Sequence, residues 1–343
     1  MKPHLQNLIK VNGAISISQF MNEALFHPKL GYYQQQNPFG RNGDFITAPE
    51  ISQVFGELIG VYFINLWQNN YFGKKINLVE MGAGRGTLMK DLLNFAKKIP
   101  NFLEQFNISI IEISPKLQEV QKANLQDFEI VWYQNFADFY QKNNDAPIFF
   151  IANELFDCFA INQFVKTENG WAEKMVGLDK NDKLQFVLRP TTTPLESAVE
   201  TKIDDVLECS AQASAFMDEL SMAIKKTNGI ALIIDYGYTQ NKFKNTLQAI
   251  KTHQYSDILK SVGESDITAL VDFSTLQKIA LKNNLQTSII TQKEFLISLG
   301  IETRREKLLI KKSINQQQEI NSTINRLIDE KQMGDLFKVL VVW

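Results

Sequence analysis

Three glycines alternate with other residues directly after a short apolar run. Residues 78–93 read LVEMGAGRGTLMKDLL, in which Gly82, Gly84 and Gly86 separate this run from a helical pattern. A glycine-rich turn between a strand and a helix is typical of a nucleotide site, because the bare backbone lets a ligand approach closely. The dinucleotide motif G-x-G-x-x-G does not fit, since Thr87 stands where its third glycine belongs.

Glu80 stands two residues before the first glycine, at the end of the apolar run. In a partly buried site its carboxylate would repel a pyrophosphate by about 1 kcal/mol or more. It would attract a ligand that carries an amino group and a sulfonium, such as S-adenosyl-L-methionine. Glu112 ends the next apolar run, ISIIEI, where an acid can accept both ribose hydroxyls of an adenosine. The two acids together predict S-adenosyl-L-methionine as the cofactor.

Two asparagines are further candidates for cofactor contacts. Asn135 follows the third apolar run and is placed to meet the edge of an adenine ring, on which Trp132 or Phe136 could pack. The alternative is that Asn135 is a turn residue and that the two aromatic residues belong to the core. Asn153 follows the fourth run and could hydrogen-bond the cofactor or the methyl acceptor.

Several sequence blocks match one protein family in order. They are GRNGDFITAPEISQVFGELIG (40–60), the glycine segment, IIEISPKLQEVQ (110–121), IANELFDCFAINQF (151–164), IIDYGY (233–238) and GESDITALVDF (263–273). The chain resembles the MidA-like family of S-adenosylmethionine-dependent methyltransferases, whose mitochondrial members are complex I assembly factors that methylate a protein arginine. The resemblance implies a class I methyltransferase fold, with a seven-stranded sheet whose last strand is antiparallel. It also implies cofactor contacts at Glu80, Gly82, Gly84, Gly86 and Glu112.

Methyl transfer to a guanidinium requires a group that orients the nitrogen and accepts its proton. Carboxylates do both, because they accept the planar guanidinium fork and can take up a proton. Glu154 and Asp157, in NELFD after the fourth apolar run, are the best candidates. Asp235 ends the next run and is a third candidate catalytic residue. The alternative for NELFD is that its acids favour the start of a helix through the helix dipole.

The block GDFITAPE, residues 43–50, has no evident core role. We expect it to fold over the cofactor as a lid that excludes water, with Gly43 and Asp44 near the ligand. In a purely structural alternative, Asp44 and Thr47 are turn and N-cap residues for a helix that begins near Pro49. Both roles could hold at once.

The elements that must position these residues alternate along the chain. From residue 76, apolar runs alternate with helical stretches, and four of the runs are continuous, as in parallel strands buried on both faces. This predicts an α/β fold with a doubly wound, Rossmann-like sheet in residues 76–343, preceded by a helical and lid region in residues 1–75. We expect a β insert at about 162–190 and an irregular insert at about 240–273.

Composition narrows the class of protein. The chain has 343 residues, 44% of them hydrophobic, with a net charge of −2. This charge argues against a nucleic-acid partner. Cys158 and Cys209 do not make a disulfide framework, and His4, His27 and His253 show no metal-ligand spacing, so we expect no metal. No apolar run is long enough for a membrane span. We expect a cytoplasmic protein, or a mitochondrial matrix protein if the source is eukaryotic.

The hypothesis we favour is a protein arginine methyltransferase whose partner is a protein substrate, with a respiratory complex I subunit implied by the resemblance. One alternative is a methyltransferase for a small molecule or RNA. Another is a non-catalytic assembly chaperone that binds the cofactor. Glu80 and Thr87 disfavour a nicotinamide dehydrogenase. Whether the chain forms a homodimer is left open by the sequence.

Overall fold

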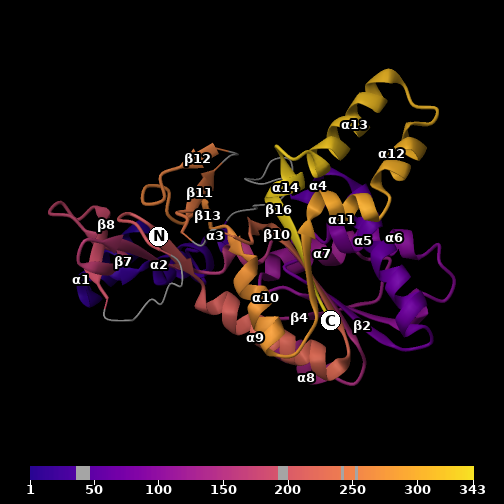
Figure 1. The fold of residues 1–343 in the computed structure, drawn as a ribbon, viewed down its shortest axis with the longest axis horizontal. Coiled ribbons are helices and arrows are strands. Elements are labelled where there is room, and N and C mark those ends of the chain that lie inside the picture. Colours follow the sequence, from indigo (N-terminus) through magenta and orange to yellow (C-terminus); the bar gives the residue numbers. More distant parts are fainter. Residues whose placement is uncertain (36–46, 192–199, 241–242, 252–253) are drawn as a thin grey trace.

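The structure is a computed structural model that describes residues 1–35, 47–191, 200–240, 243–251 and 254–343. One large sheet lies between layers of helices, and two smaller sheets lie beside it (Figure 1). The large sheet carries the candidate site at the carboxyl ends of its strands.

Seven strands form the path of the central sheet, in the spatial order β15-β16-β10-β5-β2-β3-β4. Their bounds are β2 Ile76–Met81, β3 Phe106–Ile111, β4 Ile130–Tyr133, β5 Ile148–Asn153, β10 Ile230–Tyr238, β15 Thr287–Thr291 and β16 Phe337–Val342. Strands β4, β3, β2, β5 and β10 pair in parallel, whereas β16 runs antiparallel to β10 and to β15. A short strand, β14 (Val271–Asp272), also pairs with β10. The expected doubly wound sheet with an antiparallel last strand is confirmed.

The continuous apolar runs became strands because both of their faces are covered. Every residue of β5 and β10 is buried. Successive side chains of a strand point to opposite faces, so Leu78 of β2 packs in one core and Val79 in the other. A central parallel strand therefore has no solvent face that would favour alternation of polar residues.

Helices cover both faces of the central sheet. The first core includes α5 Gln53–Leu66, α6 Thr87–Ala96, α11 Gln292–Ser298 and α13 Ile314–Ile328. The second core includes α8 Phe136–Lys142, α9 Ala211–Thr227 and α10 Phe273–Lys282. The remaining helices around the sheet are α7 Pro115–Asn124, α12 Ile301–Leu309 and α14 Met333–Leu336. In Figure 1, α12 and α13 stand out from the body.

The β insert forms a sheet of its own. Strands β6 (Asn162–Thr167), β7 (Gly170–Leu178) and β8 (Leu184–Pro190) are antiparallel, as expected, but they do not pair with the described strands of the central sheet. They join β1 (Ile15–Ser16) and β9 (Val206–Cys209) instead. Helices α1 (Lys2–Asn12) and α2 (Ile17–Phe26) cover this sheet and share a third core with it (Figure 1).

The segment at 240–273, which we expected to be mostly irregular, contains several short strands. Strands β11 (Gln248–Lys251), β12 (Gln254–Ser256) and β13 (Asp266–Thr268) form a three-stranded antiparallel sheet. These strands are too short for an alternation of apolar and polar residues to stand out in the sequence. Ala249 and Ile267 pack in the third core, so this sheet is attached to α2 and the β insert.

The N-terminal region contributes to two cores. Helices α1 and α2 belong to the third core, whereas Phe55 and Phe63 of α5 pack in the first core against the central sheet. Two short helices, α3 (Tyr32–Gln35) and α4 (Ala48–Ile51), lie between them in sequence. The division of the chain near residue 75 stays a prediction, and α5 shares its core with the sheet that follows.

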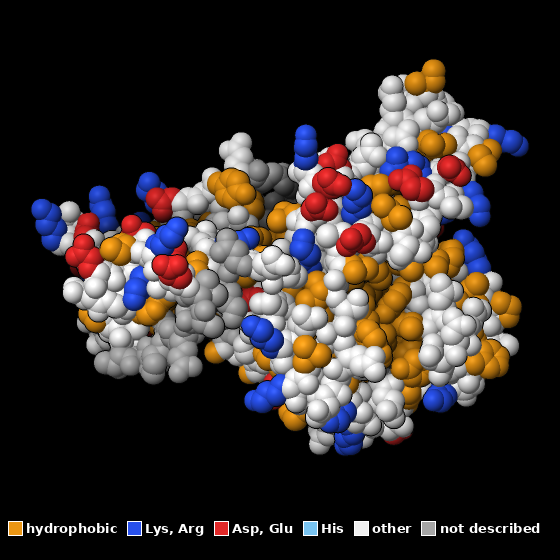
Figure 2. Space-filling view, viewed as in Figure 1, with side chains coloured by type: hydrophobic (Ala, Val, Ile, Leu, Met, Phe, Trp, Pro, Cys, Tyr) orange, Lys and Arg blue, Asp and Glu red, His pale blue; other side chains and the backbone are white. Residues whose placement is uncertain are grey.

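Acidic and basic side chains are interspersed on the face of the molecule shown in Figure 2. This pattern differs from the contiguous basic surface that is typical of nucleic-acid-binding proteins. Within the part of the chain that the structure describes, no helix combines the length and the apolar character needed to cross a membrane.

Candidate active site

The turn between β2 and α6 lines the candidate site. Gly82, Gly84 and Gly86 have positive φ angles of 73°, 54° and 79°. At Gly82 a Cβ atom would lie 2.8 Å from Cδ1 of Leu155, so a larger residue would have to displace that side chain in a strained backbone conformation. The glycines thus bring bare backbone against the segment that follows β5.

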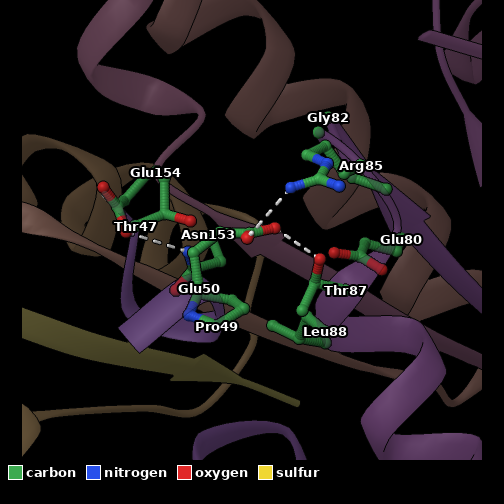
Figure 3. A pocket seen from close by; sticks show the side chains of 12 residues that line it. Thr47, Pro49, Glu50, Glu80, Gly82, Arg85, Thr87, Leu88, Asn153 and Glu154 are labelled. Carbon is green, nitrogen blue, oxygen red and sulfur yellow. Dashed lines mark hydrogen bonds and ion pairs between the residues drawn. The ribbon is translucent and has the colours of Figure 1, made fainter. Parts of the chain in front are cut away.

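Two cavities open on this turn. The smaller one is drawn in Figure 3 and is lined by Thr47, Pro49, Glu50, Glu80, Gly82, Ala83, Gly84, Arg85, Thr87, Leu88, Asn153 and Glu154. The larger one has a volume of about 550 Å³ and runs past Glu112 to α2 and α3. Gly82, Gly84 and Glu154 line both cavities, so the two meet at the glycine turn.

Glu80 lies at the smaller cavity with an unsatisfied carboxylate. Its side chain is only 3% exposed, and its Oε2 has no hydrogen-bond partner in the described residues. Burial raises the pKa of Glu80 to about 8, although a backbone N–H of Met89 opposes this shift. A buried carboxylate oxygen without a partner is costly, and a ligand ammonium group would remove that cost.

Glu112 lies at the larger cavity and is held by its neighbours. Its Oε1 accepts the backbone N–H of Ser114 at 2.9 Å, and its Oε2 accepts Nε2 of Gln121 at 3.2 Å. Gln121 also donates to the carbonyl of Gly84 at 2.9 Å and accepts from Nε1 of Trp132 at 3.0 Å. Burial raises the pKa of Glu112. One buried glutamine therefore fixes the ribose candidate relative to the glycine turn.

The positions of these two acids fit an elongated cofactor. Glu80 would bind an amino group in the smaller cavity, Glu112 would bind ribose hydroxyls in the larger one, and the glycine turn would lie beside the chain between them. The unsatisfied oxygen of Glu80 is the observation that calls for a cation. The described residues thus suit S-adenosyl-L-methionine.

Asn153 and Glu154 follow β5 and lie between the two acids. Glu154 has a φ of 52°, a conformation that costs a non-glycine residue on the order of 1 kcal/mol or more. Its N–H donates to the carbonyl of Ile234 at 2.9 Å, and its Oε1 accepts Nδ2 of Asn153 at 3.2 Å and the N–H of Ala48 at 3.0 Å. Burial raises the pKa of Glu154 to about 7. The strained turn therefore holds this carboxylate where the cavities meet.

The Oδ1 atom of Asn153 is buried and has no hydrogen-bond partner in the described residues. Because Asn153 also lines the smaller cavity, a donor of the cofactor or the acceptor could satisfy this oxygen. The contact of Asn153 with the cofactor or the acceptor stays a prediction, which its place at the cavity supports.

Helix α4 covers the smaller cavity and is tied to the glycine turn (Figure 3). Oε1 of Glu50 accepts the hydroxyl of Thr87 at 2.5 Å, and Oε2 of Glu50 lies 3.5 Å from Nη1 of Arg85. The N–H of Ala48 binds Glu154 at the other side. Sequence reasoning missed this link, because Thr87 was considered only as a departure from the dinucleotide motif.

The structure describes only part of the predicted lid, residues 47–50. Gly43 and Asp44 lie outside the described residues. Thr47 is the N-terminal cap residue of α4, as the alternative expected, although its side chain makes no capping hydrogen bond. The lid stays a prediction, which the ties between α4 and the glycine turn support.

Asp235 was expected at the reacting atoms, but the structure gives it another role. Its Oδ2 accepts the N–H groups of Leu155, Phe156 and Asp157 at 3.1, 2.9 and 3.2 Å, and its Oδ1 accepts that of Tyr236 at 2.8 Å. Burial and the nearby acids raise the pKa of Asp235, whereas the four N–H donors stabilise its charged form. Asp235 therefore holds the turn that follows Glu154.

Asp157 also differs from its expected place. It lies in the short 3₁₀ helix Phe156–Cys158 and accepts the hydroxyl of Tyr236. Burial raises the pKa of Asp157 to about 6. Among the described residues that line the two cavities, Glu154 is present and Asp157 and Asp235 are not. The spacing of three in NELFD does not place the two acids together, because the chain turns at Glu154 instead of starting a helix there.

Asn135 and Gly86 are not brought to the cavities either. The Oδ1 atom of Asn135 accepts the N–H of Asp138 at 2.8 Å, which makes Asn135 the N-terminal cap of α8, and Phe136 is buried in the second core. This matches the alternative of a turn residue with a core aromatic neighbour. Gly86 precedes α6 in a left-handed conformation, where a Cβ atom would lie 2.9 Å from Leu125.

The fold brings together one group that sequence spacing did not suggest. Ligand atoms of His4, Glu23 and His27 lie within 4.8 Å of one another. Nε2 of His4 lies 2.8 Å from Oε2 of Glu23, and Nδ1 of His27 accepts the N–H groups of Lys29 and Leu30. Two donors at Nδ1 favour the tautomer whose Nε2 carries the proton, and that proton opposes metal binding by His27. The absence of a metal stays a prediction.

Comparisons with known proteins agree with this geometry. A family model for S-adenosyl-L-methionine-dependent methyltransferases matches residues 58–291. Among curated relatives, the protein arginine methyltransferase NDUFAF7, mitochondrial, of Danio rerio is 36% identical over 99% of this chain and 86% of the relative. Its counterpart of Homo sapiens is 35% identical over 98% of this chain and 82% of the relative.

Among solved structures, a Burkholderia thailandensis protein bound to S-adenosyl-homocysteine superimposes with a TM-score of 0.87. It is 24% identical, over 99% of this chain and 91% of that chain, and its likeness shows the fold. A native structure from the same organism has a TM-score of 0.85 at 22% identity, over 99% of this chain and 90% of that chain. On the family match, the chain belongs to the S-adenosyl-L-methionine-dependent methyltransferases, and S-adenosyl-L-methionine is its cofactor.

Proposed function

We propose that this methyltransferase modifies an arginine side chain of a protein. The observation that carries the proposal is Glu154, a partly buried carboxylate at the meeting point of the two cavities. When bound, the cofactor supplies an activated methyl group on a sulfonium. Glu154 can accept two N–H groups of a guanidinium, which turns the remaining nitrogen toward that methyl. The names of the curated relatives support this acceptor.

Proton transfer is the second task of Glu154 in this proposal. The methylated guanidinium nitrogen loses a proton, and a carboxylate whose pKa is raised to about 7 can take it up near neutral pH. Asn153 donates to the same Oε1 and helps to orient it. The backbone N–H of Ala48 does the same from α4, so the position of α4 and the placement of the base are linked.

The test is transfer of labelled methyl groups from S-adenosyl-L-methionine to arginine-containing proteins, followed by identification of the modified residue. We expect N-methylarginine with the wild-type chain. With Glu154→Gln we expect the rate of methyl transfer to fall by a factor of about 100 or more, since a general base contributes that much. S-adenosyl-homocysteine should still bind to this variant. Label that appears only in small molecules or nucleic acid would reject the protein acceptor.

The proposal also extends to the acceptor protein, the oligomeric state and the cellular location. The family resemblance points to a subunit of respiratory complex I as the first acceptor to test. A homodimer is an open alternative that light scattering on the purified chain would settle. The curated relatives are named mitochondrial, so the matrix is the first location to test if the source is eukaryotic, and the cytoplasm otherwise.

A further inference from the structure

We infer that the aromatic wall formed by Phe26 and Tyr33 at the larger cavity is the entry for the acceptor side chain, and that it selects a guanidinium. This inference rests on the proposed arginine methylation and adds the residues that would recognise the acceptor. The larger cavity is lined by two separate sets of helices and strands.

One part of the larger cavity belongs to the cofactor and the other does not. Ile111, Glu112 and Leu117 line it from β3 and α7, where the ribose candidate lies. Phe26 of α2 and Tyr33 of α3 line it from the third core, on elements with no predicted cofactor contact. Glu154 lines the same cavity, so a side chain that enters along α2 and α3 can reach the carboxylate.

The two rings form a fixed surface. The rings of Phe26 and Tyr33 are stacked, with centroids 5.4 Å apart and an angle of 24° between their planes. The hydroxyl of Tyr33 donates toward both carboxylate oxygens of Asp266, at 3.2 Å each. Asp266 is buried in β13, so the small sheet of residues 248–268 anchors this wall.

This wall suits a guanidinium better than an ammonium group. A guanidinium is planar and weakly hydrated, so it can stack on aromatic rings while it enters an apolar cavity. A lysine ammonium is strongly hydrated and loses more on entering such a cavity. A neutral isostere has similar N–H donors but no charge, so it would gain less from the rings and from the carboxylate of Glu154. The cavity therefore favours arginine over lysine and over citrulline.

The first experiment uses the wild-type chain and three peptides that differ only in arginine, lysine or citrulline at one position. We expect the arginine peptide to be methylated, and the other two to compete with it at least tenfold more weakly than an unlabelled arginine peptide. Equal competition by the citrulline peptide would overturn the inference.

The second experiment compares variants of the wall. Phe26→Leu keeps an apolar side chain but removes the aromatic face, so KM for the arginine peptide should rise roughly tenfold, with kcat and the affinity for S-adenosyl-homocysteine within twofold. Tyr33→Phe keeps the ring but loses the hydroxyl bond to Asp266 that anchors the wall, so KM should rise less than in Phe26→Leu. Phe186→Leu, on an exposed strand of the β insert, is the matched control.

Two results would overturn the assignment. An unchanged KM in Phe26→Leu would show that the wall does not meet the acceptor. An equal loss of S-adenosyl-homocysteine affinity would assign the wall to the cofactor. Failure of the proposed function has a different signature: the wild-type chain would bind S-adenosyl-homocysteine and transfer no methyl group to any arginine.

Discussion

At the scale of single residues, the unsatisfied carboxylate of Glu80 makes the sharpest prediction. Glu80→Gln keeps the shape of the side chain and removes the charge that would bind the amino group of the cofactor. We expect the affinity for S-adenosyl-homocysteine to fall about tenfold or more, because a buried charge-assisted hydrogen bond is worth roughly 1.5–3 kcal/mol. Calorimetric titration measures this, and an unchanged affinity would contradict the role given to Glu80.

The same residue makes the cofactor-free protein sensitive to pH. Burial raises the pKa of Glu80 from 4.5 to about 8, so the folded state holds the proton more tightly than the unfolded state. The contribution of Glu80 to stability should therefore fall as pH rises from about 4.5 to about 8, by a few kcal/mol in order of magnitude, and stay constant above that window.

Urea denaturation of the wild-type chain and Glu80→Gln at several pH values checks this prediction. Other acids titrate in both proteins and largely cancel in the difference between their free energies of unfolding. We expect the variant to gain stability relative to the wild type between pH 5 and pH 8. A difference that does not depend on pH would show that Glu80 has an ordinary pKa.

At the scale of elements, Asp235 joins two segments that are distant in sequence. It receives three consecutive N–H groups from the turn after β5, and this turn carries Glu154. Both carboxylate oxygens of Asp235 accept backbone N–H groups, and Asp235→Asn replaces one of them with an NH2 donor. We therefore expect a loss of roughly 2–4 kcal/mol in the free energy of unfolding. We also expect a lower kcat, because Glu154 would lose its fixed position.

The control for this variant is Asp272→Ala, because Asn would cap a helix about as well as Asp does. Asp272 caps α10 by accepting the N–H of Thr275, away from the two cavities. This control should destabilise the protein without lowering kcat at a temperature where it is folded. If both variants keep the wild-type kcat, Asp235 contributes only to stability.

Helix α4 supplies the second prediction at this scale. Thr87→Val keeps the volume of the side chain but removes the hydroxyl that binds Glu50, so α4 loses one tie to the glycine turn. We expect S-adenosyl-homocysteine to dissociate several-fold faster, which stopped-flow measurements would detect. Thr323→Val in α13 removes a hydroxyl bond to the carbonyl of Ile320 and should leave the rate unchanged.

The elements also show what a sequence can and cannot predict. Strands β5 and β10 were predictable because a strand buried on both faces reads as a continuous apolar run. Glu80 and Glu112 could be expected at one site because strand ends at one edge of a parallel sheet lie close together in space, and both line the cavities there. Asp235 was misplaced because its partners lie about 80 residues away in sequence, and a strand-end acid looks the same whether it binds ligand or backbone.

Strand pairings between segments that are distant in sequence could not be predicted either. Strand β1 has only two residues, and it pairs with β7 at Val176 and Met175. Local propensity carries almost no signal for a strand of that length. The wall of Phe26 and Tyr33 depends on this packing, because α2 and α3 lie against the third core. The acceptor side of the site was therefore less predictable than the cofactor side.

At the scale of the whole molecule, ligand binding should stabilise the fold, because the site joins the central sheet, α4 and the third core. S-adenosyl-homocysteine at about 100 times its Kd should raise the free energy of unfolding by about 2.7 kcal/mol, if it binds only the folded state. A dinucleotide such as NAD should give no shift above about pH 8, where Glu80 is charged, because a pyrophosphate at the glycine turn would lie beside that carboxylate. Thermal unfolding with each ligand compares the two directly. A rise in stability with NAD and none with S-adenosyl-homocysteine would contradict the cofactor assignment. In Glu80→Gln, which lacks the carboxylate charge, the two ligands should differ much less in their effect on stability.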